Sequence, residues 1–387
     1  AVPVTLTSAG FADLLGYTLP QLPGVAAAQL YLSQQQERRG LATAPCTEPV
    51  TEAYLVAGGG QAGRAERLVL QNPGGNPVTV DVTVLGSGGT LEAPGGQGVV
   101  VAPGQRAVLL VDALAPGEES PVLHVEAEGG PVTAALGDRW LAGTRDLGMA
   151  VTPPATLPGT DLLLPGVRVP DSDRTRASAQ LRVAVPGETE AVVQVRLLTP
   201  EGPARIGEDV TRVPAGQVVD IPLGDLPAGH HAVQVRSDEP VVAAAMLSHR
   251  ATDQVPPAHR EGPLGDLTWL PATEPVGRLA GAPVAGAGDL ETTSVLVLAA
   301  REERQVTVVT VGPEGATSEQ EVSVPAAGTG TVRAPAGGSV WVRGGDEHVH
   351  AALVTGAGDS AGPYLAATPL LPSPLTRDIS QLVPWLP

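Results

Sequence analysis

The sequence repeats itself at a spacing of about 110 residues, and this feature limits the available folds more than any other. A five-residue segment, Pro131–Ala135, recurs at Pro240–Ala244 and at His348–Ala352, and its valine is spaced by 109 and then 108 residues. Three glycines ahead of these segments are each 112 residues apart: Gly104, Gly216 and Gly328. Such a chain folds as several similar units, each with its own core. We therefore predict three domains, at residues 53–150, 155–262 and 266–372.

Each copy contains runs in which valine alternates with other residues. Val78–Leu85, Ala191–Leu198 and Gln305–Val311 occupy the same place in successive copies. Alternation with period two is typical of a strand with one buried face, and no helical segment separates these runs. About seven strands per hundred residues are typical of immunoglobulin-like sandwiches, so we predict an all-β chain of three tandem immunoglobulin-like antiparallel β-sandwich domains. The cysteine pair and tryptophan of antibody cores are absent, so Val, Leu and Ala must fill the cores.

Proline-rich connectors that resemble one another separate the copies. They are Pro45–Pro49, Pro154–Pro158, Pro271–Pro275 and, more loosely, Ala366–Pro369. Proline fixes its own φ and favours an extended neighbour, so these connectors should hold adjacent domains at restricted angles and give a semi-rigid rod. Cys46 occupies a connector position that is alanine in other copies, which predicts a small space-filling residue rather than a reactive thiol.

The two ends of the chain fall outside the three predicted domains. Residues 1–52 form an N-terminal extension that we expect to dock on the first domain, and residues 373–387 form a C-terminal tail. Val25–Ala27 precedes Val132 by 107 residues, so the extension is either the end of a partial fourth copy or a chance match in a chain rich in valine and alanine. Two short helices are predicted after capping Ser and Thr residues, at Ala9–Leu15 and Arg377–Leu382.

The charge balance excludes some partners. The chain has 41 acidic residues, 23 basic residues that are all arginine, and a formal net charge of −18. Binding to phosphate backbones or to anionic lipid requires clustered positive charge, so we predict no nucleic-acid partner. The single cysteine allows no intramolecular disulfide and no zinc site.

The sequence also carries an expectation about location. No stretch reaches 18 consecutive apolar residues, and the chain starts at Ala1 without a methionine or a charged leader. These features predict a trimmed product from which a signal or an N-terminal membrane anchor was removed. We therefore expect an extracytoplasmic protein that contacts the membrane only through that missing anchor.

A glycine-rich segment, Gly58–Gly63, follows the apolar run Ala53–Ala57 and satisfies the pattern G-x-G-x-x-G, with Asp81 eighteen residues further on. In dinucleotide-binding proteins the glycines precede a helix whose N-terminal amides face the pyrophosphate. Here only Arg64–Gln71 is available for such a helix, and the repeat aligns Arg67–Leu70 within it with predicted strands of the later copies. We therefore interpret the segment as a loop between strands and predict no cofactor.

Ser360 lies in Gly358–Gly362, which matches G-x-S-x-G and is similar to the nucleophile segment of trypsin-like proteases. A serine hydrolase needs a base, a residue that orients the base and an oxyanion hole. No histidine follows Ser360, which excludes the chain order of the α/β-hydrolases. The histidines available in the protease order lie on predicted strands: His124, His230, His231, His348 and His350. A loop is the favoured interpretation.

Two patterns suggest metal ligands but are incomplete. Asp171 and Asp173 match the start of a calcium loop, but the later oxygen ligands and the glycine at its sixth place are lacking. His348 and His350 place two imidazoles on one face of a predicted strand without a third ligand nearby, so a partly exposed strand face is expected. We predict no metal site and no catalytic residue.

Two stretches carry a family resemblance: Gly40–Gly60 (GLATAPCTEPVTEAYLVAGGG) and Arg67–Val84 (RLVLQNPGGNPVTVDVTV). They resemble an uncharacterised family of actinobacterial envelope proteins, known as a domain of unknown function, and the resemblance covers most of the chain. It implies export, an N-terminal membrane segment and proximity to membrane glycosyltransferases. Its motifs are structural, so it transfers no catalytic residue.

These observations predict a non-catalytic, extracytoplasmic cell-envelope scaffold or accessory subunit that binds a protein, such as a membrane glycosyltransferase. The alternative is a glycan-binding or adhesin-like module that retains cell-wall polysaccharide. Sugar-binding sandwiches stack sugars on several aromatic rings, whereas aromatic residues make up 2% of this chain. Trp140, Trp269 and Trp385 lie at or near connectors, where packing between domains is their expected role. Serine hydrolysis through Ser360 is the least favoured alternative.

Overall fold

A computed structural model describes residues 4–8, 25–35, 38–206, 210–256, 262–286 and 288–373, the first of these segments by its backbone alone. The fold is all-β with antiparallel sheets, as predicted. The described residues include one short α-helix, α1 (Val111–Leu114), and one 3₁₀ turn at Pro94–Gly96. The helices predicted at Ala9–Leu15 and Arg377–Leu382 lie outside the described residues, as does Trp385.

The strands form where the sequence alternates. In β6 (Val78–Gly86), Val78, Val80 and Val82 are buried, whereas Thr79 between them is exposed. Branching at Cβ restricts the valine side chain in a way that an extended strand tolerates, and the alternation places one row of methyl groups in the core. The same pattern recurs in the corresponding strands of the later copies, β15 (Ala191–Thr199) and β23 (Arg304–Val311).

Strands β4 to β12 form two sheets, which we call unit 1. The front sheet, which contains the first strand of the unit, has the order β4 (Glu52–Val56), β10 (Val122–Glu128), β6 and β7 (Gly89–Leu91), with β8 (Val99–Val101) also paired to β6. The back sheet has the order β12 (Arg145–Thr152), β11 (Thr133–Ala142), β5 (Arg64–Gln71) and β9 (Arg106–Leu110). Aliphatic residues such as Leu68, Val80 and Leu136 fill the core between the two sheets.

Unit 2 comprises β13 to β20. Its front sheet contains β13 (Gly159–Val169), β19 (Gly229–Ala251), β15, β16 (Gly202–Arg205) and β17 (Thr211–Val213). Its back sheet contains β20 (Gly265–Pro271), β19 again, β14 (Thr175–Ala184) and β18 (Val218–Pro222). The 23-residue β19 belongs to both sheets, because its first half pairs with β13 and β15 and its second half with β14 and β20.

Unit 3 comprises β21 to β28. Its front sheet has the order β21 (Gly277–Pro283), β26 (Ser339–Asp346), β23 and β24 (Thr317–Val324). Its back sheet has the order β28 (Pro363–Pro369), β27 (Val349–Gly358), β22 (Thr292–Ala300) and β25 (Gly328–Ala334). The front and back sheets of all three units therefore follow the same strand order.

The N-terminal residues form a separate sheet with the order β3 (Gly40–Pro45), β2 (Val25–Ser33) and β1 (Val4–Ser8). This order repeats the first three strands of each back sheet, such as β12, β11 and β5 in unit 1. Of the two hypotheses for the extension, the strand order favours a partial fourth copy over a chance match.

Strand pairing shifts the ends of two units. All of β20 except its first residue, Gly265, lies within the range 266–372 of the predicted third domain, but the strand pairs with β19 and so belongs with unit 2. Ala366–Pro369, interpreted above as a loose connector, lies inside β28. The two strands end at equivalent positions. Pro369 lies four residues after Leu365, as Pro271 lies four residues after Leu267, and each proline is the last residue of its strand because it has no N–H group with which to continue the pairing.

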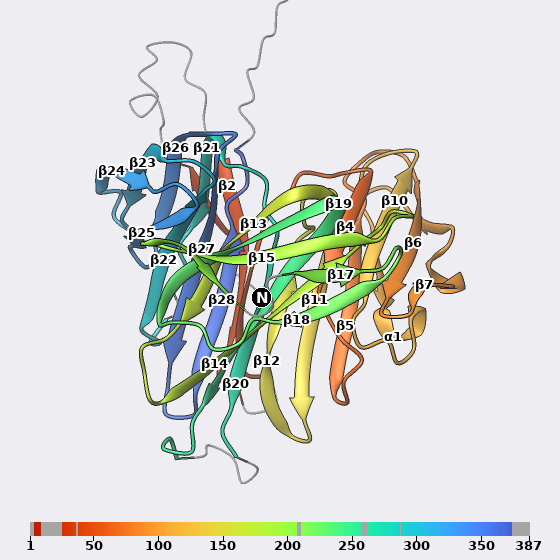
Figure 1. Cartoon of the computed structure of the whole chain (residues 1–387), viewed down its shortest axis with the longest axis horizontal. Coiled ribbons are helices and arrows are strands. Elements are labelled where there is room, and N and C mark those ends of the chain that lie inside the picture. Colours follow the sequence, from red (N-terminus) through yellow and green to blue (C-terminus); the bar gives the residue numbers. More distant parts are fainter. Residues whose placement is uncertain are drawn as a thin grey trace, which may run out of the picture.

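The units do not form a rod, and that expectation was wrong. The last strands of the four copies, β3, β12, β20 and β28, pack against one another, and we call them the central strands. All seven residues of β20 and all seven of β28 are buried. Each of these strands must therefore be covered on both faces, and packing against neighbouring copies provides that cover. Figure 1 shows β2 beside β21 and β26 at one end of the molecule, with unit 1 at the other end.

The units share cores because each back sheet lies on the front sheet of the preceding unit. The core of unit 1 includes Val242 and Ala244 from the back sheet of unit 2. The core of unit 2 includes Val297 and Val354 from the back sheet of unit 3. In the same way, the N-terminal sheet lies on the front sheet of unit 3, where Ala26 packs against a cluster of Leu279, Val309 and Trp341.

Candidate functional site

The central strands meet at one buried carboxylate, that of Asp266 on β20. Its Oδ2 accepts hydrogen bonds from the backbone N–H groups of Leu41 at 2.9 Å and Leu365 at 3.0 Å. Its Oδ1 accepts those of Met149 at 3.1 Å and Leu267 at 3.0 Å. The four donors occupy the same position on the four central strands. One side chain therefore satisfies N–H groups of all four copies that would otherwise be buried without a partner.

The neighbouring copies leave room for this carboxylate. At the position of Asp266, β12 has Gly148 and the N-terminal sheet has Gly40. A Cβ atom on Gly148 would lie 2.6 Å from Oδ1 of Asp266 and would overlap the backbone nitrogen of Leu267, and the φ of Gly148 is +124°. Burial raises the pKa of Asp266 to about 7, although the four N–H donors act to lower it.

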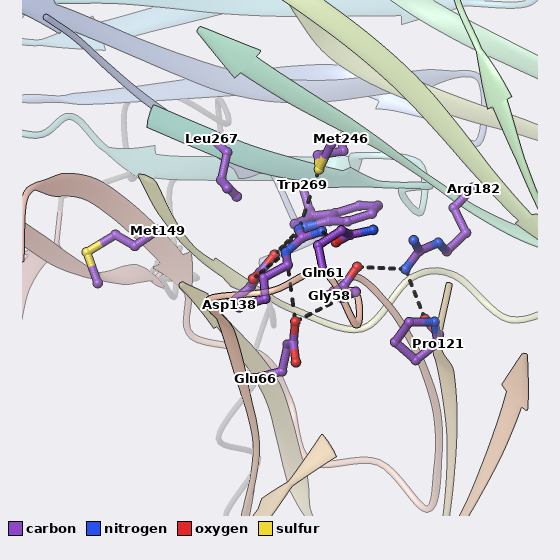
Figure 2. Close-up of polar contacts among 12 residues, drawn as sticks. Gly58, Gln61, Glu66, Pro121, Asp138, Met149, Arg182, Met246, Leu267 and Trp269 are labelled. Atoms are coloured by element: carbon purple, nitrogen blue, oxygen red, sulfur yellow. Dashed lines mark hydrogen bonds and ion pairs between the residues drawn. The ribbon is translucent and has the colours of Figure 1, made fainter. Parts of the chain in front are cut away.

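A second buried polar network joins unit 1 to unit 2. Asp138 accepts hydrogen bonds from Arg64 Nε at 3.1 Å, from Arg64 Nη2 at 2.6 Å and from Trp269 Nε1 at 2.9 Å. Figure 2 shows Asp138 and Trp269 facing each other at the boundary, with Met246 beside them. The Arg64 guanidinium also lies 5.0 Å from the ring centre of Trp140. Trp269 of unit 2 thus packs against unit 1, and the ring centre of Trp140 lies 5.3 Å from the guanidinium of Arg250 in unit 2, in agreement with the predicted packing role between domains.

Arg182 of unit 2 reaches across the same boundary. It forms a two-point ion pair with Asp220, with Nε–Oδ1 at 2.8 Å and Nη2–Oδ2 at 2.9 Å. Its Nη1 donates to the carbonyl oxygens of Gly58 at 2.9 Å and Pro121 at 3.2 Å, as Figure 2 shows. The guanidinium thus fixes the glycine-rich loop of unit 1 against unit 2.

The structure places Gly58–Gly63 in the loop between strands β4 and β5, and Arg64–Gln71 is a strand rather than a helix. A Cβ atom on Gly63, whose φ is +82°, would overlap the carbonyl oxygen of Leu141, so glycine is required there for packing. Asp81, the acidic residue of the motif, accepts the N–H of Gly98 at 2.7 Å. These positions have structural roles.

Glu66 is the one acidic side chain of this network with a resolved shift. It is 1% exposed, and its Oε1 accepts the N–H of Gly59 at 2.9 Å and lies 3.8 Å from Arg64 Nε. Burial, followed by the charge of Asp138, raises the pKa of Glu66 to about 7. The network therefore contains a carboxyl that can gain a proton near neutral pH.

His350 lies at the boundary between units 2 and 3, where the structure overturns the expected exposed pair of imidazoles. It is 3% exposed, whereas His348 lies in the turn before β27. The Nδ1 of His350 lies 2.8 Å from the carbonyl oxygen of Thr273, and its Nε2 lies 3.0 Å from Arg301 Nη1. Burial and the charge of Arg301 lower the pKa of His350 to about 4. Alternation predicted the strand but not the packing of the next unit onto it.

The N-terminal sheet is attached to unit 3 through Arg39. Its guanidinium donates to the carbonyl oxygens of Pro363 at 2.8 Å and Gly362 at 2.6 Å, and it forms a 2.9 Å ion pair with Asp359. It also stacks 3.7 Å from the ring centre of Tyr364, whose hydroxyl donates to Asp359 at 2.6 Å. This arginine holds the turn between β27 and β28 in place.

Ser360 lies exposed in that turn, consistent with the predicted loop. A cavity of about 400 Å³ borders it, and the described residues that line this cavity include no histidine. Asp359, next to it, is occupied by Arg39 and Tyr364. The described geometry brings no base to the Ser360 hydroxyl.

The remaining sequence candidates are exposed. We had expected Cys46 to be a small space-filling residue, and this was wrong. Its side chain is exposed beside a groove of about 250 Å³. Asp171 and Asp173 are exposed in the turn before β14.

Among the described residues, no group of three or more His, Cys, Asp or Glu could hold a metal ion. None of the described helices is long and apolar enough to cross a membrane.

The connectors converge on one open cavity of about 530 Å³, which we call the connector pocket. Each of the four copies contributes a wall to it: Thr47–Glu52, Pro154–Leu157, Pro271–Glu274 and Pro369–Ser373. The walls are tied together, since Thr156 N donates to the Ala272 carbonyl at 3.0 Å and the Thr156 hydroxyl donates to Glu274. A concave apolar surface held by rigid elements is the usual form of a binding site.

A family model of unknown function, DUF5719, matches residues 17–335. The chain belongs to this family. The match begins between β1 and β2 and ends after β25, so it covers β2 and β3 of the partial copy, units 1 and 2, and the first strands of unit 3. No curated protein matches the sequence.

In this DUF5719 chain the sequence did not reveal the residues that assemble the copies. Asp266, Asp138, Arg64, Arg182 and Arg39 belong to no motif of known spacing, and their partners lie far away in the sequence. One signal was present: an acidic residue inside an otherwise apolar strand, as in Gly265–Pro271, must find a buried partner. The connector pocket could have been suspected only if the connectors had been known to converge.

Proposed function

We propose that this DUF5719 protein is a non-catalytic, extracytoplasmic scaffold or accessory subunit of the cell envelope, and that it binds an apolar segment of a partner protein in the connector pocket. The observation that carries the proposal is the convergence of the four connectors on one cavity of about 530 Å³. A site assembled from all four copies requires the copies to be held together, which explains the buried networks between them.

The chemistry of the lining favours a peptide chain over a sugar. Proline, alanine and leucine make half of the lining, and the described lining residues include no aromatic ring on which a sugar could stack. The acidic side chains at the pocket are Glu48, Glu52 and Glu274, and no lining residue is basic. We therefore expect a partner segment in which aliphatic residues adjoin Lys or Arg.

The pocket also has the rigidity that binding requires. Proline restricts the backbone of each wall, and hydrogen bonds join the second and third connectors. Little conformational entropy would be lost on binding, which favours affinity in a small site. A membrane protein of the envelope, such as a glycosyltransferase, is the kind of partner that we propose.

The test is purification of the tagged protein from its native membrane fraction, with and without a charge in the pocket. Leu157 is 50% exposed in the pocket wall, and Leu157→Asp should reduce recovery of the partner about tenfold or more. Val100→Asp is the matched control, because Val100 is 65% exposed but lies on β8 of unit 1.

Three results would count against this proposal. Recovery of the same partner by Leu157→Asp would remove the pocket from the binding site. Equal loss in the Val100→Asp control would indicate a general effect of charge. If no protein is recovered while the pure chain retains cell-wall polysaccharide, the glycan-binding alternative replaces the scaffold.

A further inference from the structure

Among the residues that the structure describes, the packing of the copies leaves one sheet face without a sheet over it. The back sheet of unit 2 lies on the front sheet of unit 1, the back sheet of unit 3 lies on that of unit 2, and the N-terminal sheet lies on that of unit 3. The back sheet of unit 1, with the order β12-β11-β5-β9, has no front sheet over its outer face in the described part of the chain. The partial fourth copy, which would supply that layer, has only its back sheet among the described residues.

Equivalent positions show that this face is open. Val242 and Ala244 on β19 are both 0% exposed, beneath unit 1. On β11 the equivalent residues, Thr133 and Ala135, are only partly buried. Likewise Ala184 on β14 is 0% exposed, whereas its equivalent on β5, Gln71, is exposed. The strands are matched through their pairs in the register, Ala184↔Val242 in unit 2 and Gln71↔Thr133 in unit 1.

The open face combines an apolar row with positive charge. Val108, Val69 and Ala135 lie next to one another across β9, β5 and β11. Arg106 and Arg67 are exposed on either side of this row. No outward position of these three strands carries Asp or Glu, although the whole chain has a net charge of −18. The face therefore attracts a surface that is acidic and partly apolar.

The face also has an open edge and a groove. β9 pairs only with β5 in the described structure, and its Val108 and Leu110 are 48% and 52% exposed. Arg106 at its start is the only charged residue of β9, so most of this edge carries no charge or proline that would protect it. At the other end of the face is the groove of about 250 Å³, between Val69 and Val151 of unit 1 and Gln29 and Ala44 of the N-terminal sheet. The groove thus lies between the N-terminal sheet and the back sheet of unit 1, at the position where the other copies have a front sheet.

We infer that the outer face of the unit 1 back sheet binds a second protein, which occupies the layer that a front sheet fills in the other copies and presents an acidic β-strand to β9, Arg67 and Arg106. A second copy of this chain cannot bind in the same way, because each of its front sheets is already covered. Gln71 and Thr133 stand where unit 2 has Ala184 and Val242, and this polar character is typical of an interface that forms and separates.

The experiment is site-specific photo-cross-linking in the native envelope. The photoreactive residue p-benzoylphenylalanine replaces Val108 in one variant and Val100, on the front sheet, in the control. We expect a cross-link at position 108 to an acidic strand of another protein. Arg67→Glu with Arg106→Glu should lower its yield about tenfold or more. Arg176→Glu with Arg333→Glu, at exposed positions of β14 and β25, changes the net charge equally and should leave the yield unchanged.

Each other result would overturn the inference. These results are a cross-link to a second copy of the chain, a cross-link to a segment without Asp or Glu, and an equal yield at position 100. Insensitivity to the Arg67 and Arg106 reversals, or no cross-link at position 108, would do the same. The circular dichroism spectrum of each variant confirms that it is folded before its yield is compared.

Discussion

Arg64 and Asp138 should be strongly coupled, and a double-mutant cycle on this pair tests the assembly of units 1 and 2. Asp138 accepts three hydrogen bonds, two from Arg64 and one from Trp269, and the side chains of the ion pair are 2% and 0% exposed. Asp138→Ala leaves the buried arginine with Gln61, the Met246 sulfur at 3.5 Å and the more distant Glu66 as polar partners. Arg64→Ala leaves the aspartate buried with Trp269 alone.

The size of the effect follows from these contacts. Hydrogen bonds to charged groups contribute about 1.5–3 kcal/mol each, and removal of one partner of a buried ion pair costs about 3–5 kcal/mol. We expect each single variant to lose about 3–5 kcal/mol of unfolding free energy. The double variant removes both charges and should also lose about 3–5 kcal/mol, so the coupling free energy should be about 3–5 kcal/mol.

Guanidinium unfolding followed by tryptophan fluorescence measures these values, because Trp140 and Trp269 lie within the network. Asp225→Ala, at an exposed position, is the control and should change the unfolding free energy by less than about 0.5 kcal/mol. A double variant whose loss equals the sum of the two single losses would refute the reasoning, because the pair would then contribute no coupling across the boundary.

Three further predictions follow from the other sites. Burial raises the pKa of Asp266 and Glu66 to about 7, so their contribution to stability is present below about pH 4 and is lost as the pH rises towards 7. Burial lowers the pKa of three histidines to about 4, namely His230, His249 and His350. The contribution of these histidines to stability is therefore present above about pH 6.5 and is lost as the pH falls. The opposing slopes place the maximum unfolding free energy between about pH 6 and 7, and denaturant titrations at pH 5, 6.5 and 8 that rise steadily would contradict this. Arg39→Ala should cost about 3–5 kcal/mol and expose the N-terminal sheet to limited proteolysis, whereas the exposed neighbour Arg38→Ala should behave as wild type. The protein should not react with a fluorophosphonate probe, and labelling that Ser360→Ala abolishes would overturn the non-catalytic proposal.

Local patterns predicted the elements because they depend on neighbouring residues. The alternation in Val78–Leu85 fixed β6, since a strand buries every second side chain whatever lies across the core. The alignment of Arg67–Leu70 with strands of the later copies correctly made the glycine-rich segment a loop. In both cases the physical cause lies within a few residues of the prediction.

The assembly of the copies could not be predicted in this way, because its contacts join distant residues. Proline in the connectors indicated stiff links, and stiffness alone is compatible with both a rod and a cluster. The deciding information was the burial of both faces of β20 and β28, which is visible in the sequence only as short apolar runs. The same runs are compatible with either the end of one domain or the start of the next. For this reason the predicted third domain includes most of β20, whereas the strand pairs with β19 of unit 2.

The repeat that identified the units also concealed the residue at their centre. Equivalent positions of the four copies approach one another at the central strands, so an aspartate in every copy would bring four buried carboxylates together, and their charges would repel. Only one copy can carry the acid there. Gly40 and Gly148 make room for Asp266, and Tyr364 turns instead to Arg39 and Asp359. In a fold of this kind the residues that join the copies must therefore stand where the copies differ, and a comparison based on what the copies share passes over them.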